Sequence, residues 1–308
     1  MKTTIKTEVA RKAITAGLPL LVLGLILSHR GNQMQAADRP ESKTEIVLTE
    51  DVEWTPLNPA RGDKGPKAGT LWGDRAGDRQ TGFLVKFADG FSSPPHIHNI
   101  TYRGVVISGL VHNDDPGAEK MWMPPASFWT QPAGEVHITA AKGADNMAYI
   151  EIERGPYLVL PSEEANDNGE RPVNVHESNL IWLSAADTTW IDSADRESST
   201  KGPWISHLWG KLESGKASGT LLKLPVGFEG EIQSNNPSFR VVVIEGYPQM
   251  QEVGIPETTS LEPGNYFGSK GASNYRVSAG SKKETILYIR TDGSYKVSPK
   301  EISNQATQ

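Results

Sequence analysis

Three histidines are the residues of this sequence best suited to chemistry. His96 and His98 are one residue apart, and His137 ends the later run Pro-Ala-Gly-Glu-Val-His. Side chains of a strand alternate between its faces, so His96 and His98 point the same way. The Pro-x-Gly turn before His137 can bring the third ring opposite them. Three converging neutral imidazoles make a metal site with open positions, which suits zinc, iron, copper or nickel better than oxygen-seeking ions.

The elements that must position these histidines are short strands. Thirty Gly and 21 Pro suit a turn-rich all-β chain. Alternation in residues 81–87 (TGFLVKF) predicts a half-buried strand, while 104–110 (GVVISGL) and 147–152 (MAYIEI) predict buried strands. Residues 45–48 (EIVL) indicate a first strand. Because no long stretch has a helical period, we expect an all-β fold.

Composition excludes several classes of protein. The 308 residues contain no Cys, which excludes disulfides and cysteine-based zinc sites or nucleophiles. The net charge of −6 argues against a nucleic-acid partner. The sequence has no G-x-S-x-G elbow, phosphate loop or dinucleotide fingerprint. A small-molecule substrate or ligand is therefore the expected partner.

The N-terminal segment has the pattern of an export signal. Basic residues (Lys2, Lys6, Arg11 and Lys12) precede an apolar run at 13–28, and small residues follow at Ala36-Ala37. The apolar run is short for a spanning helix. We expect residues 1–37 to be a signal peptide or an uncleaved membrane anchor. Either way the body would be exported, periplasmic or secreted, and membrane contact would occur only through this segment.

The chain contains an internal repeat. A shift of 137 residues relates Trp72, Gly82, Phe91, Arg103 and Gly109 to Trp209, Gly219, Phe228, Arg240 and Gly246. Near the end, Tyr149-Ile150 matches Tyr288-Ile289 at a shift of 139. We expect two copies of one all-β unit at 44–161 and 176–299, joined by a polar linker at 162–175. The recurrence of Arg103 favours a structural role over binding of a substrate carboxylate.

The second copy lacks the histidines. At the shift of 137, Gln233 and Asn235 replace His96 and His98. We expect His137 to fall opposite Tyr266 or Phe267 of the second copy. The turns and strand pattern are retained. The histidines are therefore expected to serve a site rather than the fold.

The spacing of these residues resembles the two motifs of the cupin superfamily. The first is Gly90-x5-His96-x-His98-x3-Tyr102-x6-Gly109, and the second is Pro132-x-Gly134-x2-His137. Both halves are covered, so the chain is similar to a bicupin with one degenerate copy, and it resembles bacterial cupins of the anti-sigma-factor and acetylacetone-cleaving types. The resemblance implies two tandem double-stranded β-helix (jelly-roll) barrels after the export segment, with a metal in the mouth of the first.

Tyr102 stands where the cupin pattern has a glutamate ligand. The resemblance therefore carries over His96, His98 and His137 as metal ligands and leaves the fourth ligand open. Tyr102 is a candidate catalytic residue, as a donor near the metal or a phenol aimed at a metal-bound ligand. The alternative is packing, because Phe239 occupies the matching position.

Other polar residues near the motifs have two interpretations. Glu135, two residues before His137, is a second candidate catalytic residue, an acid or base facing the pocket; the alternative is a solvated hairpin residue. Glu151 and Glu153 could replace the missing carboxylate if they face inward. His112 is expected at the barrel edge, with direct ligation as the alternative.

The resemblance implies a metal-dependent enzyme. One divalent transition metal is expected, Fe(II) or Zn(II), with Mn or Ni as alternatives. The expected reaction is dioxygenase-like oxidative cleavage of a small organic acid or dicarbonyl. Two other functions remain open: a non-catalytic zinc-binding protein that senses a ligand or partner, and a metal-assisted isomerase or hydrolase. The degenerate copy is expected to cover sheet edges or mediate contacts in a homodimer.

Overall fold

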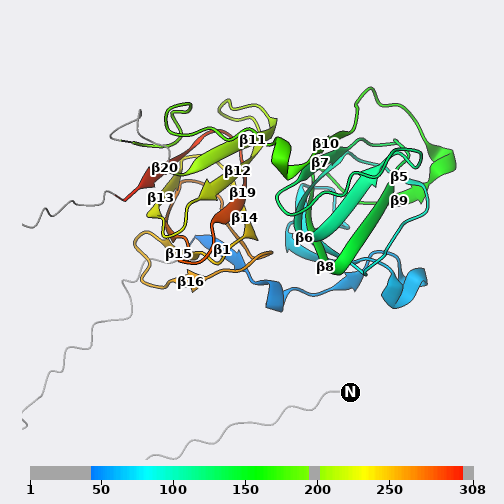
Figure 1. Cartoon of the computed structure of the whole chain (residues 1–308), viewed down its shortest axis with the longest axis horizontal. Coiled ribbons are helices and arrows are strands. Elements are labelled where there is room, and N and C mark those ends of the chain that lie inside the picture. The colour runs from blue at the N-terminus through cyan, green and yellow to red at the C-terminus, as the bar shows by residue number, and fades with distance from the viewer. Residues whose placement is uncertain (1–42, 194–201, 301–308) are drawn as a thin grey trace, which may run out of the picture. The chain divides into compact units, whose positions relative to one another are not determined.

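A computed structural model describes residues 43–193 and 202–300 (Figure 1). The segment 1–37, predicted to be an export signal or anchor, lies outside the described residues. Within those ranges, no helix is both long and apolar enough to cross a membrane.

The described residues are almost entirely β, as predicted. The earlier strands are β1 (Thr44–Val47), β2 (Thr55–Pro56), β3 (Lys67–Trp72), β4 (Thr81–Phe87), β5 (His96–His98), β6 (Tyr102–Asp114), β7 (Phe128–Gln131), β8 (Ile138–Ile152), β9 (Val159–Pro161) and β10 (Val173–Val175). The later strands are β11 (Trp204–Gly210), β12 (Ser218–Leu224), β13 (Glu229–Ser234), β14 (Phe239–Glu245), β15 (Gln249–Glu252), β16 (Thr259–Ser260), β17 (Tyr266–Ser269), β18 (Ser273–Ser278), β19 (Thr285–Thr291) and β20 (Tyr295–Pro299). Short 3₁₀ turns complete the list: η2 (Thr49–Asp51), η3 (Pro59–Lys64), η4 (Ser162–Glu164) and η5 (Glu177–Asn179).

The strands form antiparallel, jelly-roll-like sheets in two groups. In residues 55–175, here called the first half, a seven-stranded sheet has the order β10-β7-β6-β8-β4-β3-β2, and β5 pairs with β9. In residues 204–299, the second half, a five-stranded sheet has the order β16-β15-β18-β13-β20. The remaining six-stranded sheet has the order β1-β17-β14-β19-β12-β11. The predicted domain boundaries stay a prediction.

Matched residues of the two halves occupy matched backbone positions. Trp72 pairs with Gly82 beside a bulge in β3, and Trp209 pairs with Gly219 beside a bulge in β11. In both glycines an added Cβ would meet the paired indole, at 2.2 Å and 1.9 Å. The repeat seen in the sequence is therefore a repeat of local structure, because each tryptophan needs a glycine opposite it.

The register corrects one detail of the repeat. Strands β6 and β14 pair with β7 and β17 in equivalent registers, which places Gln131 at the position of Ser269. The shift there is 138 residues. Further along, His96 pairs with His137 in the first half, and Gln233 pairs with Asn274 of β18 in the second half, so His137 corresponds to β18 and not to Tyr266 or Phe267 of β17. Tyr275 is fully buried in the apolar core of the second half. The second half therefore has a buried aromatic ring beside the position that corresponds to His137.

Two strands have partners that the sequence did not predict. β1, expected to be the first strand of the first copy, pairs with β17 of the second half (Figure 1). In turn β10, within the expected linker, pairs with β7 of the first half. β1 therefore completes a sheet of the second half, and the linker segment contains a strand where it was expected to be only a polar connection.

A bulge in β6 shapes the interior of the first half. The register of β6 against β8 shifts on both sides of Ser108, and Gly109 has a φ of 72°. A Cβ at Gly109 would lie 2.1 Å from the Asn146 side-chain oxygen, so the turn requires glycine. Beyond the bulge β6 continues to Asp114, and this extension places Asn113 beside Tyr102.

Candidate metal centre

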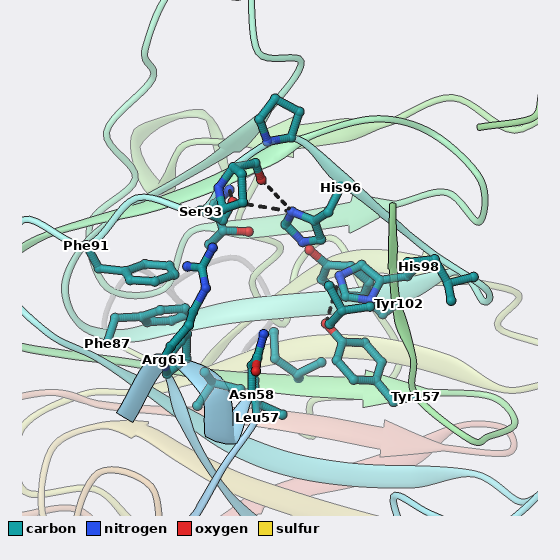
Figure 2. Close-up of a pocket in the computed structure, with 18 of the residues that line it drawn as sticks. Leu57, Asn58, Arg61, Phe87, Phe91, Ser93, His96, His98, Tyr102 and Tyr157 are labelled. Atoms are coloured by element: carbon teal, nitrogen blue, oxygen red, sulfur yellow. Dashed lines mark hydrogen bonds between the residues drawn. The ribbon is translucent and has the colours of Figure 1, made fainter. Parts of the chain in front are cut away.

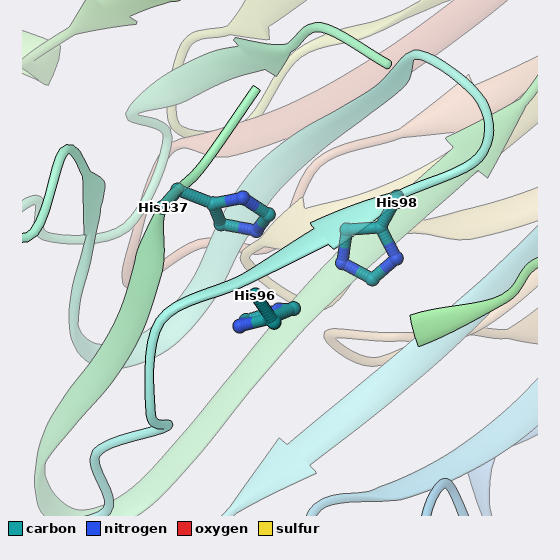
Figure 3. Close-up of side chains that lie close together, drawn as sticks. All are labelled: His96, His98 and His137. Carbon is teal, nitrogen blue, oxygen red and sulfur yellow. The ribbon is translucent and has the colours of Figure 1, made fainter. Parts of the chain in front are cut away.

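The three predicted histidines meet inside the first half. Their ring centroids are 4.3 to 5.2 Å apart. One ring nitrogen of each lies within 4.8 Å of the others, and Figure 3 shows the rings directed toward a common centre. An ion that holds each nitrogen at about 2.0–2.1 Å draws its ligands closer than this, so small side-chain rotations would complete the coordination.

Backbone pairing brings the rings together. His96 and His137 form an antiparallel bridge, with N–H···O distances of 3.1 and 3.0 Å. The Gly134 amide donates to the His98 carbonyl at 2.9 Å. Gly134 has a φ of 77°, and a Cβ there would lie 2.5 Å from the Asn166 carbonyl oxygen. The Pro-x-Gly turn thus requires glycine, and it delivers His137 to β5 as the sequence predicted.

Backbone carbonyls select the tautomer of each imidazole. The Nδ1 atoms of His96, His98 and His137 lie 3.0, 2.8 and 3.2 Å from the carbonyl oxygens of Pro94, Leu158 and Glu135. A carbonyl oxygen only accepts, so each Nδ1 carries the proton and each Nε2 keeps its lone pair. Carbonyl partners of this kind orient metal-binding histidines. The three residues therefore fit a divalent transition metal.

Burial keeps these rings neutral. His98 and His137 are buried, and His96 is partly exposed. Burial and repulsion from the neighbouring His96 lower the pKa of His137 to about 3. Burial, followed by the other two rings, holds the pKa of His98 well below its ordinary value. Neutral rings are the form that binds metal, so protons do not compete for the site near neutral pH.

Tyr102 takes part in a hydrogen-bond chain behind the histidines. The Gln131 amide donates to the Glu135 carbonyl at 3.3 Å, and its side-chain oxygen accepts from the Asn113 amide at 2.9 Å. The Asn113 oxygen then accepts from the Tyr102 hydroxyl at 2.8 Å. Because this orientation directs the tyrosine proton to Asn113, the phenol oxygen and His137 Nε2, 3.3 Å apart, do not share a hydrogen bond while Nδ1 carries the His137 proton. Burial raises the pKa of Tyr102, so it is a neutral phenol.

Tyr157 is a site residue that sequence reasoning missed. Its hydroxyl lies 3.1 Å from His98 Nε2 and donates to that lone pair. The two rings stack with centroids 4.4 Å apart. Tyr157 stands outside both histidine motifs, and only the pairing of β9 with β5 brings it here. A metal on His98 would displace this hydrogen bond.

The histidines open onto an apolar pocket of about 310 Å³ (Figure 2). Its walls include Val85, Phe87, Phe91, Ile150 and Tyr157, and His96, His98 and Tyr102 line one side. Of the lining residues that the structure describes, Arg61 is the only one with a formal charge, and none is acidic. Enclosed pockets of this kind, with few polar groups, hold small organic molecules.

A family model described as a domain of unknown function, DUF4437, matches residues 45–298. This match spans most of the chain and both halves. The chain belongs to the DUF4437 family. A search of curated proteins finds no match.

Solved structures with similar folds include proteins of several kinds. A proposed dioxygenase of Nostoc punctiforme aligns at a TM-score of 0.58 and 13% identity, over 86% of this chain and 85% of that one. YlbA of Escherichia coli, described with family model DUF861, gives 0.54 and 13% over 83% and 94%. Oxalate decarboxylase of Lactobacillus farciminis, in a formate complex, gives 0.52 and 10% over 83% and 88%. At these identities the similarity establishes a cupin-type fold for this DUF4437 chain and nothing about its reaction.

The other candidate residues lie elsewhere in the DUF4437 fold. The Glu135 side chain lines a separate pocket with Asp167 and Arg171. Only the Glu135 backbone carbonyl contacts the site, and its catalytic role stays a prediction. His112 is buried in β6 and lies near Trp122, with ring centroids 6.1 Å apart. It is absent from the three-histidine group.

The late-strand carboxylates of the DUF4437 chain contact the second half. Glu151 is buried near Arg290, with an O···N distance of 3.9 Å, and Glu153 pairs with Arg290 at 2.8 Å and with Arg103 at 2.9 Å. Glu151 and Glu153 therefore do not replace the glutamate ligand that the cupin pattern has at the position of Tyr102. The Arg103 guanidinium also lies over Trp209, 3.8 Å from the ring centroid. Its structural role, expected from the repeat, agrees with these contacts.

Proposed function

We propose that this chain is an exported bicupin whose first half holds one divalent transition metal, Fe(II) or Zn(II), and catalyses a dioxygenase-like cleavage of a small organic molecule. The observation that carries the proposal is the set of three Nε2 lone pairs beside an apolar pocket. The Nδ1–carbonyl bonds orient those lone pairs before any ion binds. The N-terminal basic and apolar pattern supports export.

A bound ion would supply Lewis acidity and, if it is iron, redox chemistry toward oxygen. The residues of the chain have distinct tasks. The apolar walls exclude water and hold the body of the substrate. The Tyr102 oxygen accepts a hydrogen bond from a group at the centre, because its own proton is directed to Asn113. Tyr157 can donate its proton to a substrate oxygen once it leaves His98.

The three neutral imidazoles support an enzyme that polarises an anionic or chelating substrate. Among the described residues, no carboxylate joins the three histidines to neutralise part of the +2 charge, so the ion would be a strong Lewis acid. The dioxygenase and decarboxylase among the structures of similar fold are consistent with this chemistry.

A second candidate is a non-catalytic zinc protein that senses a ligand. One feature of the pocket favours this non-catalytic protein. None of its described lining residues is acidic, so the pocket has no carboxylate that could act as a general base. The same observation disfavours a metal-assisted isomerase or hydrolase, which needs a group to move protons.

Metal content and oxygen uptake test the proposal. Protein purified without added metal should contain about one equivalent of iron or zinc, and the iron form should consume oxygen with 1,3-dicarbonyl or organic-acid substrates. His98→Ala should lose the metal and remain folded, because the second half folds the same unit without histidines. His207→Ala, at an exposed position outside the site, should keep the metal. Tightly held zinc with no oxygen uptake would favour the sensing protein.

Removing the metal gives an independent readout. A ligand that binds only the native state stabilises it, by about 2.7 kcal/mol when its concentration is a hundred times its Kd. Chelation should therefore lower the thermal unfolding midpoint of the wild type and leave that of His98→Ala unchanged. Equal responses of the two proteins would mean that these histidines hold no ion.

A further inference from the structure

The pocket beside the histidines contains one isolated positive charge. Arg61 lies in η3, the 3₁₀ segment between β2 and β3, and Figure 2 shows its side chain projecting into the pocket from the wall opposite Tyr157. The guanidinium carbon lies 5.9 Å from the centroid of Phe91, whose ring packs on Phe87 with centroids 5.6 Å apart. The guanidinium therefore rests against an aromatic wall, with its N–H groups available at the edge.

Arg61 faces no opposite charge among the side chains that the structure describes. Within the part of the chain that the structure describes, Arg61 forms no ion pair, and no acidic residue lines the pocket. An arginine that is half-buried among apolar side chains gains most from a bidentate carboxylate or a similar planar anion.

We propose that the pocket takes a small apolar monocarboxylate whose acid group pairs with Arg61 while its other end reaches His96, His98 and His137. This assignment rests on the proposed function, since it treats the pocket as the substrate pocket. The proposed function allows either an organic acid or a neutral dicarbonyl as the substrate. Pairing with Arg61 favours the organic acid. The volume of about 310 Å³ lies at the small end of the range for organic ligands, and the aromatic and branched walls suit a single ring or a short branched chain.

Binding of matched acids and amides tests this assignment. Benzoate and phenylacetate would be compared with benzamide and phenylacetamide, which have the same shapes without the charge. Calorimetry and thermal shift would be measured on the full-length protein, both zinc-loaded and metal-free. We expect each acid to bind at least tenfold more tightly than its amide, and this preference to shrink as salt is raised.

Arg61 variants assign the preference to one side chain. Arg61→Gln should abolish it, and Arg61→Lys should retain part of it, because the charge remains without the planar fork. Lys64→Gln is the matched control: Lys64 lies in the same segment but is not among the residues that line the pocket, so the preference should be unchanged. The unfolding midpoint of each unliganded variant checks that it is folded.

Two results would overturn the assignment. One is equal binding of acids and amides by the wild type, including no binding of either. The other is a preference that survives in Arg61→Gln but disappears when metal is removed, which would place the carboxylate on the ion. Failure of the proposed function would give a different set of results from failure of the Arg61 assignment. The protein would hold no metal and consume no oxygen, but its metal-free form would still bind acids more tightly than amides through Arg61.

Discussion

Each of the three histidines uses one ring nitrogen on a backbone carbonyl and presents the other to the centre. This division explains how three polar rings can be buried without charge. Two of the inward lone pairs already have a phenol nearby: Tyr157 donates to His98, and the Tyr102 oxygen lies beside His137. The two tyrosines are therefore not equivalent, because the proton of Tyr157 competes with a metal and the proton of Tyr102 does not.

Tyr157→Phe should strengthen metal binding. The substitution removes a hydrogen bond that an ion must displace, and a net hydrogen bond is worth about 0.5–1.5 kcal/mol. We expect zinc to bind about two- to tenfold more tightly, as measured by competition with a chromophoric chelator. Tyr102→Phe serves as the comparison and should show no such gain. Weaker binding by Tyr157→Phe would mean that its hydroxyl supports the bound ion.

At the scale of elements, the segment that leads into β9 orients one of the three histidines, His98. Asn99 follows β5 and holds this segment at two points: its amide donates to the Pro156 carbonyl at 3.0 Å, and its oxygen accepts from the Leu158 amide at 2.9 Å. The Leu158 carbonyl then accepts from His98 Nδ1. Residues 155–161 thus act as a strap across β5, and Asn99 aligns the strap with the ring that it orients.

Asn99→Ala should loosen the strap. Losing two hydrogen bonds at a partly exposed position should lower the free energy of unfolding by about 1–2 kcal/mol. Loss of the partner that orients a ligand should weaken zinc binding by about tenfold. Urea denaturation and chelator competition measure the two effects. Asn168→Ala, in an exposed loop, should change neither. An unchanged zinc affinity in Asn99→Ala would show that the strap is not needed to orient His98.

At the scale of the molecule, the residues retained by the repeat join the two halves. Arg103 lies over Trp209, and Arg240 lies over Trp72 with its guanidinium carbon 4.0 Å from the ring centroid. Each arginine stacks on the tryptophan of the other half, as in an interface with two-fold symmetry. One buried core also contains side chains from both halves, including Leu84, Tyr149, Leu221 and Tyr288.

Arg240→Ala should destabilise the whole chain without affecting the metal centre. A desolvated cation–π contact contributes about 1–2 kcal/mol, and the shared core predicts that both halves unfold in one transition. Urea denaturation followed by tryptophan fluorescence and by far-UV circular dichroism should give coincident curves with a lower midpoint. Zinc affinity should equal that of the wild type. Two separate transitions would contradict a shared core.

The sequence alone determined the strand content, the repeat and the grouping of the three histidines, because each depends on local spacing. His96 and His98 share a face by strand periodicity, and the Pro-x-Gly turn before His137 permits only one kind of chain reversal. Only the tertiary structure decided which residues surround them. Tyr157, Arg61 and Asn99 contact the site through strand pairing and packing between distant segments, which leave no periodic signal. The pairing of β1 with β17 and of β10 with β7 escaped prediction for the same reason, since an exposed strand edge accepts any chain that reaches it.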